Sequence, residues 1–365
     1  MLNHFYNRII PILYQLMLGL TFINEFVILI KNRGWKFMDN SEREIFWKTL
    51  CDLDGKDIVS DSLKLQTAIK YPHSICRYRS VTLNSIEALQ TNKLYFSSAD
   101  YYDDPFDTYL SIDWEFVKTK LSAHDYSSQS QFETLLHVCK ELGVPTEKIT
   151  FDRFSALDKE LALKNTIYHL AEVIRPHIQK HLFSIAFAED PLNENLWLKY
   201  ANNHKGFCLE YNLHDEPSSL IKKPNHEMSL YPVYYSNEKY NATDYAISTL
   251  GYYVIEACNL DAARAYQQSV PMWWETEKVS LIKHKCHEYD AEWRIISHAH
   301  QRTFIKCNPT SIYIGLKTES NERKLIVRAA VQAGIKHIYN VVISPTDKLD
   351  VEELTAQDII NNYFQ

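Results

Sequence analysis

The stretch Leu94-Tyr95-Phe96-Ser97-Ser98-Ala99-Asp100-Tyr101-Tyr102-Asp103-Asp104-Pro105-Phe106-Asp107 decides the fold that we expect for this chain. Leu94 to Phe96 alternates as a short strand, which runs directly into an acidic turn. Pro105 fixes its own φ and keeps Asp104 out of the helical region, so the turn crowds its carboxyl groups at the end of a strand. Such a cluster can serve chemistry, and a capped turn with solvated acids explains the same pattern.

Strands and helices extend outward from this stretch in both directions. Residues 75–80 alternate apolar and basic side chains, as a strand does, and residues 83–90 carry apolar side chains at helical spacing. After the acidic turn, apolar residues recur every three or four positions from about residue 113 to residue 180, which predicts a helical insertion. Residues 183–188 predict a strand, and a helix that ends near Gly206 follows it.

A second polar motif lies in residues 290–297. Period-two alternation puts Glu292 and Arg294 on one face of a predicted strand, and Trp293 and Ile295 on the other. A carboxylate and a guanidinium two positions apart can jointly bind a polar ligand. A partly buried ion pair that ties the sheet together is the alternative.

The rest of the chain predicts further helices and strands without internal repeats or flexible linkers. Helices are expected at residues 242–266, 272–284 and 319–334, strands at 311–316 and 337–343, and one last helix in the tail 349–365. The economical interpretation is a single α+β domain over residues 38–348, with a mixed or antiparallel β-sheet core and the helical insertion at about 113–180.

Composition narrows the function classes. The net charge of −7 gives no global basic character that would indicate nucleic-acid binding. Aromatic residues make up 13%, with 24 tyrosines, which fits a pocket-rich or a partner-binding protein. Seven cysteines without a C-x-x-C motif indicate a reduced cytosolic protein rather than a disulfide framework.

Glycine scarcity excludes the common nucleotide-binding loops. The chain has only 8 glycines, and the two nearest in sequence, Gly19 and Gly34, are fifteen positions apart. A G-x-G-x-x-G turn and a Walker-type loop both need clustered glycines so that backbone amides can approach phosphates. Any nucleotide bound here is therefore held by side chains and ordinary loops.

The N-terminal segment 1–37 differs from the rest. Its residues 9–30 are apolar except for Gln15, Asn24 and Glu25, and they are long enough to span a bilayer. The basic residues that follow would keep the main domain cytoplasmic. A packing helix, or a mis-assigned start with Met38 as the true beginning, explains the segment equally well. No small-residue cleavage site follows it, which argues against a secretory signal.

Three pieces of the chain together resemble a bacterial domain-of-unknown-function family, family 2971. They are the D-D-P-F-D motif at residues 103–107 after its strand, residues 196–210 and residues 288–295. Asp103 stands where the family usually has asparagine. The resemblance covers roughly residues 74–343, and the family name implies no established reaction.

A more distant resemblance is to the ADP-ribosyltransferases, which have a split mixed sheet and bind NAD without a glycine-rich loop. Arg77 matches their basic first strand, and Glu292, with Asp290 two before it, matches their late catalytic strand. A fixed carboxylate there would stabilise the oxocarbenium-like cation of nicotinamide–ribose cleavage. The resemblance implies a toxin or defence enzyme with an unknown protein or nucleic-acid acceptor. The residues that it assigns to the nucleotide are Arg77, Tyr78, Tyr95, Ser97, Asp104 and Asp107, and those that it assigns to catalysis are Glu292, Arg294 and His204.

Two other function classes stay open. A metal-dependent hydrolase or nuclease could use Asp104, Asp107 and Glu292 around Mg²⁺, with His204 as base, because hard oxygen ligands suit that ion. A non-enzymatic partner-binding protein is the third class, which the high aromatic content favours.

Overall fold

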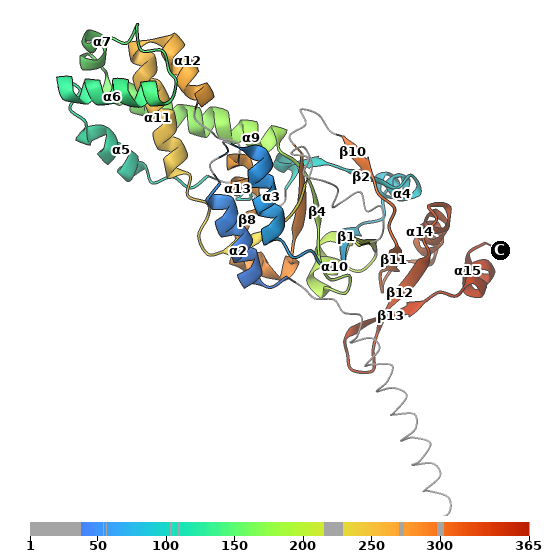
Figure 1. The fold of residues 1–365 in the computed structure, drawn as a ribbon. Coiled ribbons are helices and arrows are strands. Elements are labelled where there is room, and N and C mark those ends of the chain that lie inside the picture. The colour runs from blue at the N-terminus through green and yellow to red at the C-terminus, as the bar shows by residue number, and fades with distance from the viewer. Residues whose placement is uncertain are drawn as a thin grey trace, which may run out of the picture.

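The computed structural model describes residues 38–53, 55, 57–102, 104, 106–108, 110–214, 229–269, 274–297 and 303–364. A helical lobe lies at one end of the molecule and a body of two β-sheets at the other, with the C-terminus on the far side of the body from the lobe (Figure 1). The expected α+β class with mixed and antiparallel sheets is confirmed.

The first sheet has five strands in the order β1-β5-β11-β12-β13. Only the β11–β12 pair is parallel among these strands, and the other neighbours are antiparallel. Helices α4 (Leu83–Gln90), α14 (Ser320–Gln332) and α15 (Ala356–Tyr363) pack together beside this sheet. The strands are β1 (Ser74–Arg79), β5 (Phe207–Asn212), β11 (Ser311–Ile314), β12 (His337–Ile343) and β13 (Leu349–Glu353).

The second sheet is antiparallel, in the order β3-β4-β9-β6. Its strands are β3 (Ser97–Ser98), β4 (Phe183–Phe187), β9 (Trp293–Ser297) and β6 (Ser229–Pro232). Cys76 of β1 and Ala188, just after β4, exchange backbone hydrogen bonds of 2.7 and 2.8 Å and so join the two sheets. Two smaller sheets pair β2 (Lys93–Tyr95) with β10 (Phe304–Lys306), and β7 (Tyr234–Ser236) with β8 (Ile282–His284).

The helical lobe has a hydrophobic core of its own, to which two separate chain segments contribute. The segment expected to be a helical insertion is helical throughout much of its length and forms the larger part. Helices α11 (Thr243–Cys258) and α12 (Leu260–Ser269) return from after the second sheet to complete the lobe. The first segment comprises α5 (Trp114–Ala123), α6 (Gln129–Glu141), α7 (Phe151–Ser155), α8 (Lys159–Tyr168), the π-helix η2 (His169–Ile174) and α9 (Arg175–His181).

A buried ion pair fastens the N-terminal helices α2 (Asn40–Cys51) and α3 (Ile58–Ala68) to the body. Arg43 of α2 lies 2.5 Å from a carboxylate oxygen of Glu189, and it also donates to the carbonyl oxygens of Val233 and Glu292 at 2.8 Å each. Glu189 in turn accepts a bond from the indole of Trp293. Each polar group of the pair therefore has a partner, as buried charges require.

Two expected helices are corrected by the structure. Residues 272–284 were expected to be one helix, but they contain the short α13 (Glu275–Ser280) and then strand β8. The tail expected to be one helix begins with β13 and only then forms α15. In both places sheet pairing overrides the local pattern: β8 pairs with the distant strand β7, and β13 forms a hairpin with β12.

The membrane question lies outside the part of the chain that the structure covers. Among the described residues, no helix combines the length and apolar character needed to cross a bilayer. The apolar run at residues 9–30 lies outside the described residues, so an anchor there stays a prediction.

Candidate functional site

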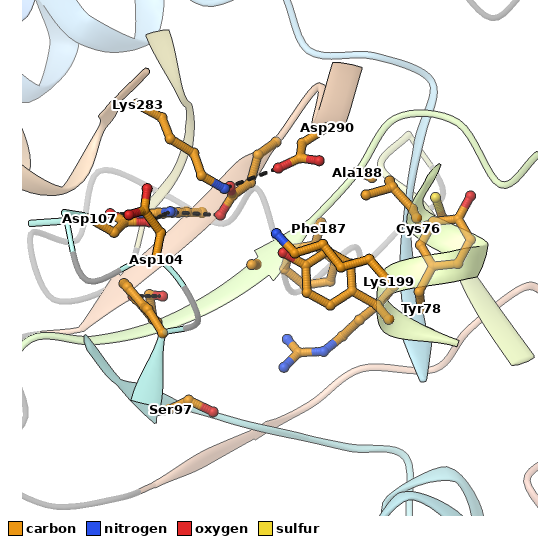
Figure 2. A pocket seen from close by; sticks show the side chains of 18 of the residues that line it. Cys76, Tyr78, Ser97, Asp104, Asp107, Phe187, Ala188, Lys199, Lys283 and Asp290 are labelled. Carbon is orange, nitrogen blue, oxygen red and sulfur yellow. Dashed lines mark hydrogen bonds and ion pairs between the residues drawn. The ribbon is translucent and has the colours of Figure 1, made fainter. Parts of the chain in front are cut away.

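A cavity of about 280 Å³ lies where the two sheets meet, beside the Cys76–Ala188 bridge. Strands β1, β3, β4, β8 and β9 contribute side chains to it, as do helix α10 (Glu194–Tyr200), the 3₁₀ helices η1 (Ala99–Tyr101) and η3 (Lys285–Asp290), and the acidic turn. Asp104, Asp107 and Lys283 lie on one side of the cavity, and Cys76 and Tyr78 on the other (Figure 2).

Arg294 organises the first side. Its two terminal nitrogens bind the two oxygens of Asp107 at 2.9 and 2.6 Å, a bidentate arrangement that fixes the acidic turn against β9. Its Nε donates to Glu292 at 2.6 Å, and Nη1 also donates to the carbonyl oxygen of Ser280 at 2.7 Å. Each guanidinium nitrogen is thus bonded inside the protein.

Lys283 extends this arrangement from β8. Its ammonium lies 3.0 Å from a carboxylate oxygen of Asp290 and 3.0 Å from one of Glu292. We call Asp107, Lys283, Asp290, Glu292 and Arg294 the charged cluster. It holds three acidic and two basic side chains, all buried.

The electrostatics of the charged cluster keep Glu292 ionised. Burial alone would raise the pKa of Glu292, but Arg294 and Lys283 together lower the pKa well below its usual range. Neighbouring Tyr102 has a pKa raised to about 12 by burial, so it stays a neutral phenol. Its hydroxyl bonds to Ser184, and its ring lies 5.1 Å from the guanidinium of Arg294.

Arg77, on β1 of the first sheet, has a terminal nitrogen without such a partner among the described residues. It is 7% exposed, and its Nη1 is buried without a hydrogen-bond partner among the described residues. Its guanidinium stacks over the ring of Phe187 at 5.7 Å. Burial, with Arg79 nearby, lowers the pKa of Arg77 below its ordinary value.

His287 lies at the edge of the charged cluster, on η3. Its Nε2 is 3.8 Å from Asp104, and its Nδ1 is 3.9 Å from Asp290. Burial lowers the pKa of His287 below 6.5, and Lys283 lowers it further. The imidazole is therefore neutral at pH 7.

The structure brings together most side chains that the sequence singled out. Seven of them line this one cavity: Arg77, Tyr78, Ser97, Asp104, Asp107, Glu292 and Arg294. Glu292 and Arg77, 215 positions apart in sequence, thus share a site, although their chemical roles stay predictions. Arg294 and Asp107 bind each other, which makes them supports of Glu292 and of the turn rather than free groups for a ligand.

Tyr95 and His204 are corrected, because neither is among the described residues that line the cavity. Tyr95 belongs to the small β2–β10 sheet, where its ring lies 5.6 Å from that of Phe304. His204 stacks on Trp197 at 6.0 Å with a left-handed backbone (φ 66°), and burial lowers its pKa. It follows helix α10, and its backbone amide donates to the carbonyl oxygen of Trp197 at 3.1 Å.

Sequence reasoning assigned no role to Lys283, which lines the cavity, or to His287, which lies beside the charged cluster. Lys283 was expected within a helix, where it has no defined relation to Glu292. His287 was not assigned to any site. A strand over 282–284, read as alternating, would have placed Lys283 apart from the apolar Ile282 and indicated a polar face.

The described residues of the acidic turn do not take part in a metal site. No group of three or more His, Cys, Asp or Glu side chains within the described ranges is arranged to hold a metal ion. Asp107 and Glu292 already accept bonds from Arg294. An Mg²⁺ ion bound by Asp104, Asp107 and Glu292 would therefore have to displace Arg294 from Asp107 and from Glu292.

Comparison with known proteins gives a match to one family, whose description names no reaction. Residues 196–295 match the family described as "Protein of unknown function (DUF2971)", which confirms the family resemblance found in the sequence. The matched segment includes α10, β8, η3 and β9, and hence four of the five members of the charged cluster. No curated protein and no solved structure matched the chain. The relation to ADP-ribosyltransferases stays a prediction.

Proposed function

We propose that this chain, whose residues 196–295 match the DUF2971 family, binds NAD in the cavity between its two sheets and cleaves the nicotinamide–ribose bond. The observation that carries the proposal is the presence of Arg77 and ionised Glu292 in one cavity. NAD has an anionic diphosphate and a cationic nicotinamide ring. A cavity with an unpaired guanidinium on one side and an excess of carboxyl groups on the other complements both.

Arg77 supplies the anion-binding side. A buried guanidinium without a counter-charge is costly, and a phosphate oxygen that accepts from Nη1 removes that cost. This binding mode fits a chain whose sparse glycines leave no phosphate-binding loop.

Glu292 supplies the transition-state side. As the nicotinamide leaves, positive charge develops on the ribose, and a carboxylate that is already ionised and fixed stabilises that charge without reorganising. Arg294 and Lys283 hold Glu292 in place through both of its oxygens. Arg294 and Lys283 also offset part of the negative charge of Glu292. Because the charged cluster has three acidic and two basic side chains, one negative charge is left to stabilise the cation.

Cavity size limits how NAD is held. Ligand pockets have volumes of roughly 300–1,000 Å³, and this cavity, at about 280 Å³, is at the lower end. We therefore place the nicotinamide riboside half and its phosphate inside, and the adenosine half outside the cavity.

The test is NAD binding by calorimetry together with nicotinamide release. Glu292→Gln is expected to lower kcat by about 100-fold, which corresponds to about 3 kcal/mol, and to change the Kd for NAD little. The matched control is Glu210→Gln. Glu210 accepts bonds from Ser74 and Tyr313 at 2.6 and 2.7 Å inside the first sheet and does not line the cavity, so its loss should leave kcat unchanged. Absence of NAD binding by the wild type would refute the proposal.

A further inference from the structure

Helix α10 presents a second basic side chain to the cavity, in addition to Arg77 on β1. Leu196, Lys199 and Tyr200 of this helix all line the cavity. Lys199 and Tyr200 follow Leu196 by three and four positions, so the three side chains share one face of the helix. Lys199 is exposed, whereas Arg77 is only 7% exposed. Arg77 therefore lies inside the cavity, and Lys199 lies at its rim.

Contacts between α10 and β1 fix the position of Lys199 relative to Arg77. Tyr78, the neighbour of Arg77 on β1, packs edge-on against Trp197 of α10, with ring centres 5.2 Å apart. The hydroxyl of Tyr78 also accepts a hydrogen bond of 3.1 Å from the backbone amide of Asn193, which caps the start of α10. The backbone that carries Lys199 is therefore held against the strand that carries Arg77.

Lys199 and Arg77 are the cavity cations that the charged cluster leaves unused. The ion pairs formed by the described residues of the cavity use Lys283 and Arg294. Neither Lys199 nor Arg77 takes part in them. The ammonium of Lys199 lies 4.8 Å from the centre of the Tyr200 ring. Burial opposes the charged form of Lys199, but Tyr200 raises its pKa above the ordinary value, so the side chain is a cation at pH 7.

We propose that Arg77 and Lys199 together bind a diphosphate, one phosphate each, and that Lys199 selects dinucleotides over mononucleotides. The inference rests on the proposed NAD site and adds its substrate class. Arg77 binds the phosphate next to the nicotinamide riboside, inside the cavity. Lys199 binds the second phosphate at the rim, where the ligand leaves toward its adenosine half. A planar guanidinium suits a buried phosphate, whereas an ammonium on a flexible stem suits a phosphate that stays partly solvated.

The first test is calorimetry with two inorganic probes, pyrophosphate and orthophosphate. Wild type should bind pyrophosphate more tightly than orthophosphate. Lys199→Gln should raise the Kd for pyrophosphate by about 10-fold, the low end for a charged hydrogen bond, because the ammonium is partly solvated. It should leave the Kd for orthophosphate unchanged, because Arg77 alone holds a single phosphate. Lys199→Arg keeps the charge and should bind pyrophosphate as wild type does.

The matched control is Lys205→Gln. Lys205 follows α10, lies 3.9 Å from Glu319 and is not among the described residues that line the cavity. The substitution removes the same charge from the same region of the surface, so it should leave the Kd for both probes unchanged. A general effect of net charge would instead appear in both lysine variants.

The second test compares NAD with nicotinamide mononucleotide, which carries one phosphate. Lys199→Gln should raise KM for NAD by about 10-fold and change kcat little, because a phosphate remote from the reacting bond is bound equally in the ground state and the transition state. For nicotinamide mononucleotide, kcat/KM should be the same in wild type and Lys199→Gln. A merely structural role of Lys199 would affect both substrates alike and would lower Tm.

The outcomes separate the diphosphate site from the proposed reaction. If wild type binds neither probe, or if Lys199→Gln keeps the wild-type Kd for pyrophosphate or loses both probes by the same factor, the diphosphate site is wrong. Nicotinamide release by wild type would then still support NAD cleavage. If wild type binds the probes as expected and releases no nicotinamide, the reaction is wrong and the diphosphate site stands.

Discussion

Replacing Arg77 by methionine is expected to stabilise the unliganded protein while weakening the binding of anionic ligands. The matched comparison is Arg43→Met, because both arginines are buried but differ in their partners. Arg43 is paired with Glu189 and two carbonyl oxygens, whereas Nη1 of Arg77 has no partner among the residues described. Methionine keeps much of the side-chain volume and removes only the charge and its donors.

The magnitudes follow from these contacts. An unsatisfied buried donor costs about 1–3 kcal/mol, and the loss of the stacking of Arg77 on Phe187 at 5.7 Å offsets about 1 kcal/mol of the gain. Arg77→Met should therefore stabilise the protein by about 1 kcal/mol. Arg43→Met leaves Glu189 buried and unpaired and should cost about 3–5 kcal/mol. With roughly 2 cal/mol/K of unfolding entropy per residue, the two variants should differ in Tm by about 5–8 °C.

Thermal unfolding and calorimetry measure the two sides of this prediction. Unliganded Arg77→Met should unfold about 1 °C above wild type and Arg43→Met several degrees below it. The Kd of Arg77→Met for NAD, or for inorganic pyrophosphate as a simpler probe, should rise by about 10- to 150-fold, the value of one charged hydrogen bond. If Arg77→Met loses as much stability as Arg43→Met, then Arg77 is a structural residue and the anion site is refuted.

Three further predictions test the frame of the site. Gly206→Ala should prevent stable folding, since its Cβ would lie 2.0 Å from the carbonyl oxygen of Arg79; soluble expression followed by circular dichroism checks this, and a native-like spectrum with unchanged Tm would contradict it. Asp107→Asn should cost about 3 kcal/mol in urea unfolding, because it weakens the bidentate bond to buried Arg294, and a loss below about 0.5 kcal/mol would contradict that bond. Glu292 has a lowered pKa in the folded state, so its stabilising contribution is present above its ordinary pKa of 4.5 and is lost as pH falls through the lowered value. The difference in urea midpoint between wild type and Glu292→Gln should stay constant above about pH 5 and shrink as pH falls below the ordinary pKa of 4.5. A difference that stays constant below that pH would show that the charge of Glu292 contributes nothing.

Local sequence patterns were sufficient for most strands of the body. Residues 337–343 were expected to be a strand and form β12 with the same bounds. Glu292 was expected to share a face with Arg294, and a hydrogen bond of 2.6 Å joins them. Both segments are rich in the β-branched and aromatic side chains that favour strands, which makes their prediction from local sequence reliable.

The misses arise where a short segment owes its structure to a distant partner. β8 pairs with β7 through residues that lie about fifty positions earlier, so no local pattern could indicate it. Tyr95 was assigned to the site because its strand leads into the acidic turn. Its pairing with β10, a strand that the pattern did not reveal, places its ring against Phe304. The unpaired Nη1 of Arg77 also could not be predicted, because it depends on the tertiary structure. The sequence shows that residue 77 is basic but not which groups surround it.

The bridge between Cys76 and Ala188 has a mechanical consequence. Arg77 follows directly on one side of this bridge, on the first sheet, whereas Arg294 and the rest of β9 belong to the second sheet. A ligand whose phosphate binds Arg77 and whose other end contacts the charged cluster would connect the two sheets a second time, in addition to the bridge. Ligand at 100 times its Kd adds about 2.7 kcal/mol to the free energy of unfolding. Because the ligand contacts both sheets, neither sheet can open while the ligand stays bound. Amide exchange in β1 and β9 should then slow in step, so that the two sheets, independent at their far edges, open as one cooperative unit.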